Sequence, residues 1–210
     1  MCDLRQLASE FIESGWYSDR AETDADEAVI KAVNERDRDP ADRRKSLVEW
    51  LSRYRVFRGL RSDSRTLIAG EIIAFADERH EDSLHRVKNN IIAEFNKLRH
   101  RISAISPRNE TSLASKALWC CYPNDVPIFD RNAASALRVI SRVCHLAPEP
   151  NQEEYASFVD VWLQVYNEIE PAIDSRNLCD CPYGVRMLDR LLWYLGRDGF
   201  YQVTSGPKRA

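Results

Sequence analysis

Apolar residues recur every three or four positions along most of this chain, which is the spacing of one face of an α-helix. The pattern predicts helices over residues 4–15, 22–37, 40–57, 60–75, 83–102, 112–121, 131–145, 151–170 and 184–199. Pro171 is expected to interrupt the eighth of these, and Gly196 or Gly199 to end the last. No alternating pattern longer than four residues indicates a strand. The chain is therefore predicted to be all-α, a compact multi-helix protein of about eight to ten helices.

The helical pattern extends over residues 1–203 without a clear linker. We expect this stretch to form one all-α unit, built either as a single body or as two helical lobes with a cleft between them, and residues 204–210 to form a flexible tail. Hydrophobic residues make up 44% and charged residues 30% of the sequence, which is typical of a folded globular protein. No apolar run approaches the length of a bilayer span, and the first residues lack the shape of a signal peptide. The expectation is a cytoplasmic protein with no membrane partner.

Six cysteines are spread along the chain without a paired CxxC pattern: Cys2, Cys120, Cys121, Cys144, Cys179 and Cys181. In the reducing compartment that we expect, they are predicted to be buried or free thiols. An iron–sulfur or zinc site is the alternative, although no histidine lies near Cys179 and Cys181 in the sequence. The sequence thus predicts no metal and no cofactor.

Charge is distributed unevenly along the chain, whose formal net charge is −3. Residues 1–50 hold 13 acidic and 8 basic residues, a balance of −5. Residues 51–70 hold five arginines against Asp63 alone, and residues 97–138 hold seven basic against three acidic residues, a balance of +4 in each segment. These two basic segments predict one basic face for nucleic acid. The alternative is that their arginines form a solvated helix surface.

The stretch that carries candidate chemistry is SLASKALWCCYPNDVPIFD, residues 112–130. Lys116 lies near the edge of the apolar face of a helix that Pro123 ends. Residues 124–127 favour a turn followed by an extended approach to the next helix. Asp130 is predicted to be the N-cap of that helix, where backbone amides and the helix dipole favour a negative charge.

The segment ASKALWCCYPNDVPIFDRNAASAL resembles the second half of the motif in the helix-hairpin-helix DNA glycosylases, together with the aspartate-bearing helix that follows it. Asp130 lies 16 positions after Ala114, the matched alanine, which is the register of the family's catalytic aspartate. RMLDRLLWYLG, residues 186–196, resembles more weakly the closing helix of small bacterial proteins that share the pattern ASK…P…PI.D. The resemblance covers about 35 residues in all.

The chain departs from the family's motif at two places. Arg108, Asn109 and Glu110 stand where the family has a Gly-x-Gly turn whose amides grip a DNA phosphate. Ser112 stands where bifunctional members have their Schiff-base lysine, so the resemblance implies a monofunctional enzyme. Lys116 could replace that Schiff-base lysine only if it reaches the same pocket from a shifted turn.

The resemblance implies an enzyme that turns a nucleotide out of the duplex and hydrolyses its N-glycosidic bond. Asp130 would supply the catalytic carboxylate, and Lys116 a phosphate contact or a nucleophile. The implied DNA contacts are Arg108, Asn109, Thr111, Ser112, Arg131 and Asn132. The aromatic residues that would stack on the extruded base or fill its gap are Trp119, Tyr122, Phe129 and Trp50. DNA is the expected partner of a monomer, and a modified base in phage DNA is the expected target.

Each of these assignments has a structural alternative. An N-cap aspartate such as Asp130 commonly serves the helix alone, a lysine such as Lys116 extends to solvent or pairs with an acid, and tryptophans fill cores. Two other functions therefore stay open. One is a non-catalytic DNA-binding helical module, and the other is a helical interaction protein with no nucleic-acid role.

Overall fold

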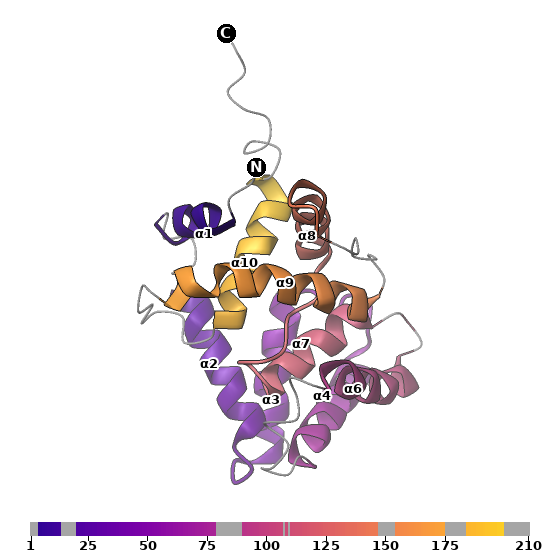
Figure 1. Cartoon of the computed structure of the whole chain (residues 1–210). Helices are drawn as coiled ribbons and strands as arrows, with labels where there is room; N and C mark the ends of the chain where they lie inside the picture. Colours follow the sequence, from indigo (N-terminus) through magenta and orange to yellow (C-terminus); the bar gives the residue numbers. More distant parts are fainter. Residues whose placement is uncertain are drawn as a thin grey trace. The chain divides into compact units, whose positions relative to one another are not determined.

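The computed structural model of the chain describes residues 4–13, 20–78, 90–106, 108, 110–146, 154–174 and 184–199 (Figure 1). Within these ranges the chain forms nine α-helices and one π-helical turn, η2, and no strand. The elements are α1 Leu4–Glu13, α2 Arg20–Asn34, α3 Pro40–Arg53, α4 Ser62–Asp77, α6 Ile91–Ile105, α7 Thr111–Cys121, α8 Arg131–Val143, α9 Tyr155–Asp174, α10 Gly184–Tyr194 and η2 Leu195–Gly199. The prediction of an all-α, multi-helix chain is confirmed.

The chain divides into two compact units. Unit 1 combines Met1–Ser18 with Phe129–Ala210 and contains α1, α8, α9, α10 and η2. Unit 2 is the continuous stretch Asp19–Ile128 and contains α2, α3, α4, α6 and α7. The stretch of candidate chemistry therefore crosses a unit boundary, because the chain leaves unit 2 two residues before Asp130.

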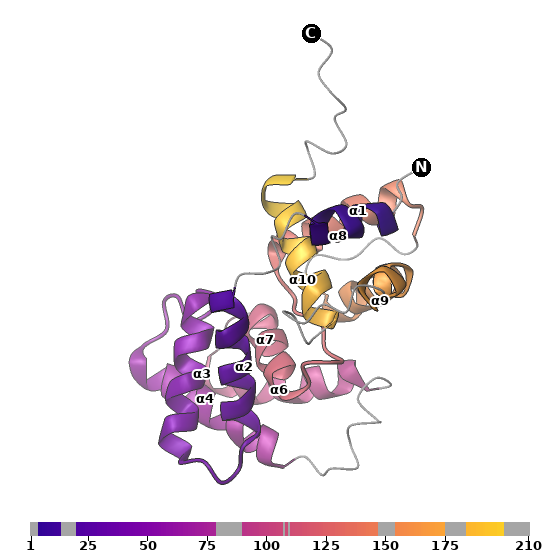
Figure 2. The ribbon, with the colours of Figure 1, turned by 90° about the vertical axis from the view of Figure 1, so that its left-hand side faces the viewer.

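Unit 2 is built around α7. Its helices α2, α3 and α4 lie side by side, and α7 packs against α2, α4 and α6 (Figure 2). Ten of the 11 residues of α7 are buried, so this helix is the centre of the core rather than a half-exposed amphipathic helix. Small residues allow that close packing, and near its end Trp119 stacks on Trp50 of α3 with ring centroids 5.5 Å apart.

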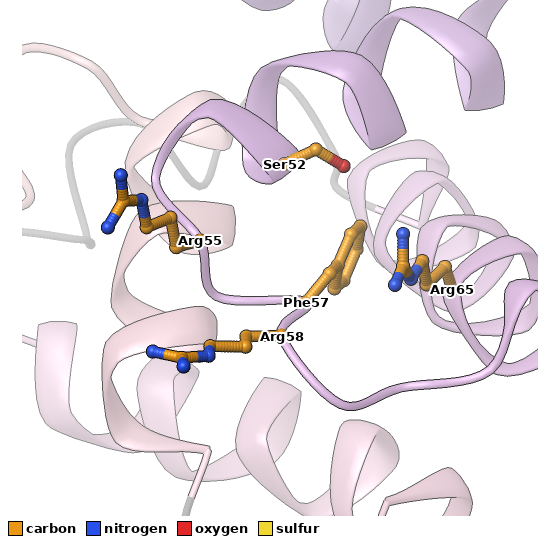
Figure 3. Close-up of a pocket in the computed structure, with 5 residues that line it drawn as sticks. All are labelled: Ser52, Arg55, Phe57, Arg58 and Arg65. Carbon is orange, nitrogen blue, oxygen red and sulfur yellow. The ribbon is translucent and has the colours of Figure 1, made fainter.

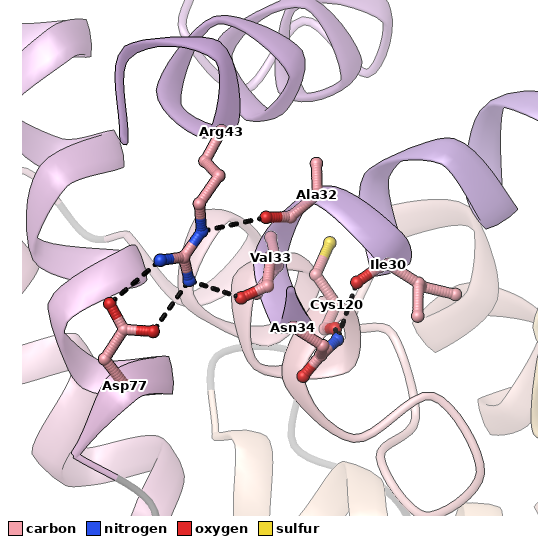
Figure 4. A network of polar contacts seen from close by, with 7 residues as sticks. All are labelled: Ile30, Ala32, Val33, Asn34, Arg43, Asp77 and Cys120. Atoms are coloured by element: carbon pink, nitrogen blue, oxygen red, sulfur yellow. Dashed lines mark hydrogen bonds and ion pairs between the residues drawn. The ribbon is translucent and has the colours of Figure 1, made fainter. Parts of the chain in front are cut away.

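A buried arginine ties the end of α2 to α4 (Figure 4). Arg43 of α3 is only 2% exposed, and it donates to the carbonyl oxygens of Ala32 at 3.0 Å and Val33 at 2.8 Å. These carbonyls belong to the last turn of α2, where no helical amide is available to them. The same guanidinium forms a bidentate pair with Asp77, at 2.7 and 3.0 Å. Because the charge is paired and its donors are used, its burial is compatible with a stable core.

An asparagine joins the ends of α2 and α7 (Figure 4). The Asn34 side-chain amide donates to the carbonyl of Ile30 at 2.7 Å and to that of Cys120 at 3.0 Å. Cys120 lies in the last turn of α7, whose carbonyls also lack helical partners. This contact fixes the end of α7, from which the chain continues toward Asp130.

Unit 1 is assembled from helices of both its chain segments. α1 packs against α9, α10 packs against α8 and α9, and η2 packs against α8 and α10. Residues 185–192 of α10 are all buried, including Arg186, Asp189 and Arg190. The Asp189 carboxylate accepts a hydrogen bond of 3.0 Å from the indole nitrogen of Trp162 in α9. A helix that is buried on all sides is the core of its unit.

Several element ends differ from the sequence predictions by a few residues, and the ends of α3 and α9 differ for a local reason. α3 ends at Arg53 instead of residue 57, because Arg55 adopts a φ of 55°, which a right-handed helix does not allow. α9 is not interrupted by Pro171 and continues to Asp174. Because Pro171 has no amide hydrogen, the Asn167 carbonyl loses its helical partner. Asn167 is exposed, so water can take the place of that amide and the helix continues. Of the two glycines predicted to end the last helix, Gly199 is the one that does so, since α10 continues through Gly196 as η2.

Candidate functional site

Helices α6 and α7 form a helical hairpin whose turn is held by charged side chains. Arg108 donates from Nε to the Glu110 carboxylate at 3.0 Å and from Nη1 to the backbone carbonyl of Arg58 at 2.7 Å. The Ser106 hydroxyl also donates to the Glu110 carboxylate, which is buried. Glu110 thus holds the hairpin turn, in the place where the family that the sequence resembles has a glycine. Asn109, a predicted DNA contact, lies outside the described residues.

The first turn of α7 differs from its predicted role as a surface for DNA. Thr111 is 4% exposed, so its side chain is a core group, and only its backbone amide at the helix start suits the predicted contact. Ser112 is half-buried, and Arg108 is exposed. Of the described hairpin residues, Arg108 and Ser112 are the ones that present side chains near the surface.

Lys116 is buried and extends back along its own helix. Its Nζ donates to the Ser112 hydroxyl at 2.8 Å and lies 5.7 Å from the centre of the Tyr54 ring. Side chains of a helix lean toward its N-terminus, so a lysine one turn after Ser112 reaches that position. The structural alternative that this lysine extends to solvent is wrong, because Lys116 is 2% exposed. Its ammonium instead occupies the neighbourhood of Ser112.

Asp130 is the N-cap of α8, as predicted. Its backbone is extended, and its Oδ1 accepts a hydrogen bond of 2.8 Å from the Asn132 amide. The residue is half-buried, and the neighbouring Arg131 is exposed. Asp130 and Asn132 thus come together in unit 1, whereas Lys116 and Ser112 come together in unit 2.

A glycine supports the start of α8 from η2. A Cβ atom added to Gly196 would lie 2.0 Å from the carbonyl oxygen of Asn132 and 2.5 Å from its carbonyl carbon. Only glycine allows this approach of two backbones. From the sequence, Gly196 was predicted only as one of two possible helix stops, with Gly199 as the other, and this role was missed. A glycine placed inside an apolar helical repeat was the available signal.

The four aromatic residues expected at an extruded base are buried. Trp50, Trp119 and Tyr122 belong to the core of unit 2, where the Trp50 indole donates to Asp26 at 2.9 Å. Phe129 is 8% exposed and packs edge-on against Phe158 of α9, with centroids 5.1 Å apart. This burial agrees with the alternative that these rings fill the core.

A hollow of about 380 Å³ lies at the end of α3 in unit 2 (Figure 3). Its lining residues are Ser52, Arg55, Phe57, Arg58 and Arg65. All five belong to residues 51–70, one of the two basic segments predicted to form a basic face for nucleic acid, and Arg65 lies in the first turn of α4. Arginine-rich character was visible in the sequence, but the hollow was not.

The described ranges hold no group of three histidine, cysteine or acidic side chains arranged to bind a metal ion. In the same ranges, Cys120 and Cys121 are buried and Cys144 is half-buried. Cys179 and Cys181, for which a metal site was the alternative, lie outside the described residues. None of the described helices has both the length and the apolar content of a bilayer span.

No protein-family model, no curated protein and no solved structure matches this chain.

Proposed function

We propose that the protein is a DNA N-glycosylase that excises a modified base, with Asp130 as its catalytic carboxylate. The observation that carries the proposal is the position of Asp130. It caps α8 directly after the connection that leaves the helical hairpin α6–α7, which is the order of elements that the resemblance implies. A target in invading phage DNA suits the departure of the hairpin turn from the glycine pattern of the family.

The proposed reaction hydrolyses the bond between the base and C1′ of the deoxyribose. The base leaves with the bonding electron pair and is protonated, while positive charge develops on the sugar. A carboxylate beside this charge stabilises the transition state. Water adds to C1′, and its proton passes to the carboxylate, so that the products are a free base and an abasic site.

Lys116 is proposed to act beside Ser112. The family that the sequence resembles has its Schiff-base lysine at the position of Ser112, and the Lys116 Nζ lies 2.8 Å from the Ser112 hydroxyl. This contact supports the view that Lys116 reaches the same neighbourhood from one turn further along α7. Its ammonium would hold a phosphate in a monofunctional enzyme, or attack C1′ in a bifunctional one.

The variant Asp130→Asn tests the catalytic role. Asparagine caps helices about as well as aspartate, so the fold should persist while the negative charge is lost. We expect base release to fall by about 10²–10⁴-fold. The measurement incubates duplexes carrying modified or unmodified bases with protein and then treats them with alkali, which breaks strands at abasic sites. Asp160→Asn, an exposed carboxylate of α9 in the same unit, is the control and should release base like the wild type.

The outcomes separate the alternatives. An Asp130→Asn variant with undiminished base release would remove the proposed mechanism. Strand breaks that appear without alkali, together with trapping by borohydride, would make Lys116 the nucleophile.

A non-catalytic DNA-binding module is the second candidate. It is favoured by the capping bond of Asp130, which explains this aspartate without any chemistry. This candidate predicts DNA binding that falls steeply with salt, survives Asp130→Asn, and releases no base from any duplex.

A further inference from the structure

The hollow at the end of α3 is lined by a loop that its own backbone holds in shape (Figure 3). The Arg55 amide donates to the Ser52 carbonyl at 3.0 Å, and the Arg58 amide donates to the Arg55 carbonyl at 3.1 Å. A third bond of 3.0 Å runs from the Leu60 amide to the Phe57 carbonyl. Three successive turns thus fix the positions from which the side chains extend.

The loop contains a non-glycine residue in a strained conformation. Arg55 has a φ of 55°, in the left-handed region that residues with a Cβ adopt only at a cost. Glycine takes this conformation without that cost, and the chain uses it four residues later, where Gly59 has a φ of 80°. Backbone strain of this kind is concentrated at functional sites, which supports a role for the Arg55 side chain.

The cations of the loop are available for a ligand. Within the described part of the chain, neither the Arg55 nor the Arg58 guanidinium forms an ion pair or a side-chain hydrogen bond, and both residues are exposed. Arg65 uses Nε to bond the Leu60 carbonyl at 3.0 Å and belongs to the same lining. In Figure 3, Arg55 and Arg58 extend in the same direction from the loop, with Arg65 on the other side of Phe57. The buried Phe57 ring gives the hollow an apolar wall.

The loop lies against the helical hairpin. The Arg108 guanidinium at the hairpin turn donates to the Arg58 carbonyl at 2.7 Å, and Lys116 of α7 lies over the ring of Tyr54. The two basic segments of the sequence therefore meet in unit 2, although Arg58 and Arg108 are 50 residues apart. The hollow is therefore the cationic surface next to the hairpin turn, and an extended anion that contacts the turn can also reach the hollow.

We propose that this hollow binds a backbone phosphate of DNA, outside the flipped nucleotide, through Arg55 and Arg58, which extend to the same side of the loop. Guanidinium groups hold phosphate through two parallel hydrogen bonds, and about 380 Å³ accommodates a phosphate with part of its sugars. The proposal extends the proposed DNA glycosylase, to which it adds a second grip on the strand beside the hairpin.

The double variant Arg55→Ala/Arg58→Ala tests the site by equilibrium binding of a short fluorescent DNA duplex to the full chain. The Arg58 carbonyl that holds Arg108 is backbone, so the hairpin contact persists. Both arginines contact the same phosphate, so their loss should lower the slope of log affinity against log salt by about 1 and weaken binding roughly 30-fold at about 0.15 M salt. Arg36→Ala/Lys45→Ala, which removes two exposed cations of unit 2 outside the hollow, should change affinity by less than about twofold.

A second variant separates binding from structure. Arg55→Gly relieves the left-handed strain, so its midpoint of thermal unfolding should rise while its duplex affinity falls about fivefold. Equal losses of affinity in the hollow variant and the control variant would show unspecific charge attraction and overturn the site. Affinity unchanged in the hollow variant would overturn it as well.

The source of the phosphate is tested with inorganic phosphate alone. If amide NMR signals of the loop respond to inorganic phosphate as strongly as to the duplex, while duplex affinity is unchanged in the double variant, the hollow holds a free phosphoanion and the DNA proposal fails. The test measures binding and not base release. If the protein releases no base but the double variant loses duplex affinity, the phosphate site is supported and the glycosylase proposal fails. If the protein releases base but the double variant binds the duplex as tightly as the wild type, the glycosylase proposal is supported and the phosphate site fails.

Discussion

Buried ionisable side chains in each unit are paired with a specific polar group. Asp26 in unit 2 accepts from the Trp50 indole, and Asp189 in unit 1 accepts from the Trp162 indole at 3.0 Å. Burial of a carboxylate is tolerated where such donors replace water. Tyr155, which is buried in unit 1, is affected by this arrangement. Burial, and secondarily the negative charge of Asp189, raises the pKa of the Tyr155 hydroxyl well above its ordinary value of 10.0.

The raised pKa of Tyr155 predicts a loss of stability in alkali. Below pH 10 the hydroxyl is neutral in both the folded and the unfolded chain, so its contribution is fully present. Above that pH the unfolded chain loses the proton first, and the free energy of unfolding falls by up to about 1.4 kcal/mol per pH unit until the folded pKa is reached. In Tyr155→Phe this part of the decline should be absent. Urea unfolding at about pH 8 and pH 11 measures it.

Tyr194→Phe, in α10 of the same unit, controls for the removal of a tyrosine hydroxyl. Parallel alkaline declines in the wild type and in Tyr155→Phe would show that Tyr155 ionises with equal ease in the folded chain.

At the residue scale, the sequence predicted the conformation of Asp130 and not the surroundings of Lys116. A cap depends on the residue and on the amides two or three positions later, which are local. The burial of Lys116 depends on α2, α4 and α6, which surround α7 and which no local pattern places.

At the scale of elements, the contact between η2 and α8 supports the candidate site. The Asn132 amide donates the capping hydrogen bond to Asp130, and the Asn132 carbonyl lies directly against Gly196. A π-helical turn widens the helix at this point, and such turns are frequent at functional positions. The start of α8 is thereby held by backbone packing as well as by its cap.

Gly196→Ala is expected to destabilise unit 1. The added methyl would meet the Asn132 carbonyl at 2.0 Å, and a backbone group moves less easily than the end of a side chain. We expect a loss of about 1–3 kcal/mol in the free energy of unfolding, measured by chemical denaturation with circular dichroism.

Gly70→Ala is the matched control for this change. Gly70 lies inside α4, where the new methyl would meet only Arg44 Cδ, at 3.9 Å. The variant should gain up to about 1 kcal/mol from helix propensity. A Gly196→Ala protein as stable as the wild type would mean that η2 and α8 separate without cost.

At the scale of the whole molecule, the division into two units assigns the proposed groups to different parts of the chain. The hairpin, Lys116 and the arginine-lined hollow belong to unit 2, and Asp130 belongs to unit 1. Unit 2 is one continuous stretch with its own core around α7. Unit 1 needs both ends of the chain, since α1 packs on α9 and Arg5 bonds the Glu168 carbonyl at 3.1 Å.

The continuity of unit 2 predicts that residues 19–128 fold alone. A fragment with a closed core should keep its helical circular dichroism and unfold in one cooperative transition. Residues 129–210 without residues 1–18 should be less stable than in the full chain, because α9 loses α1. A non-cooperative melt of the 19–128 fragment would contradict the assignment of a self-contained core.

By itself, the sequence determined that the chain is helical, where most helices begin, and that Asp130 caps α8, because apolar spacing, caps and prolines act over a few residues. It did not determine the end of α3 at the strained Arg55, the meeting of Arg58 with Arg108, or the approach of Gly196 to Asn132. The tertiary structure alone decided these, and with them the arginine-lined hollow and the division into two units. Such contacts join residues distant in the chain, and their geometry follows from how whole helices pack rather than from any local pattern.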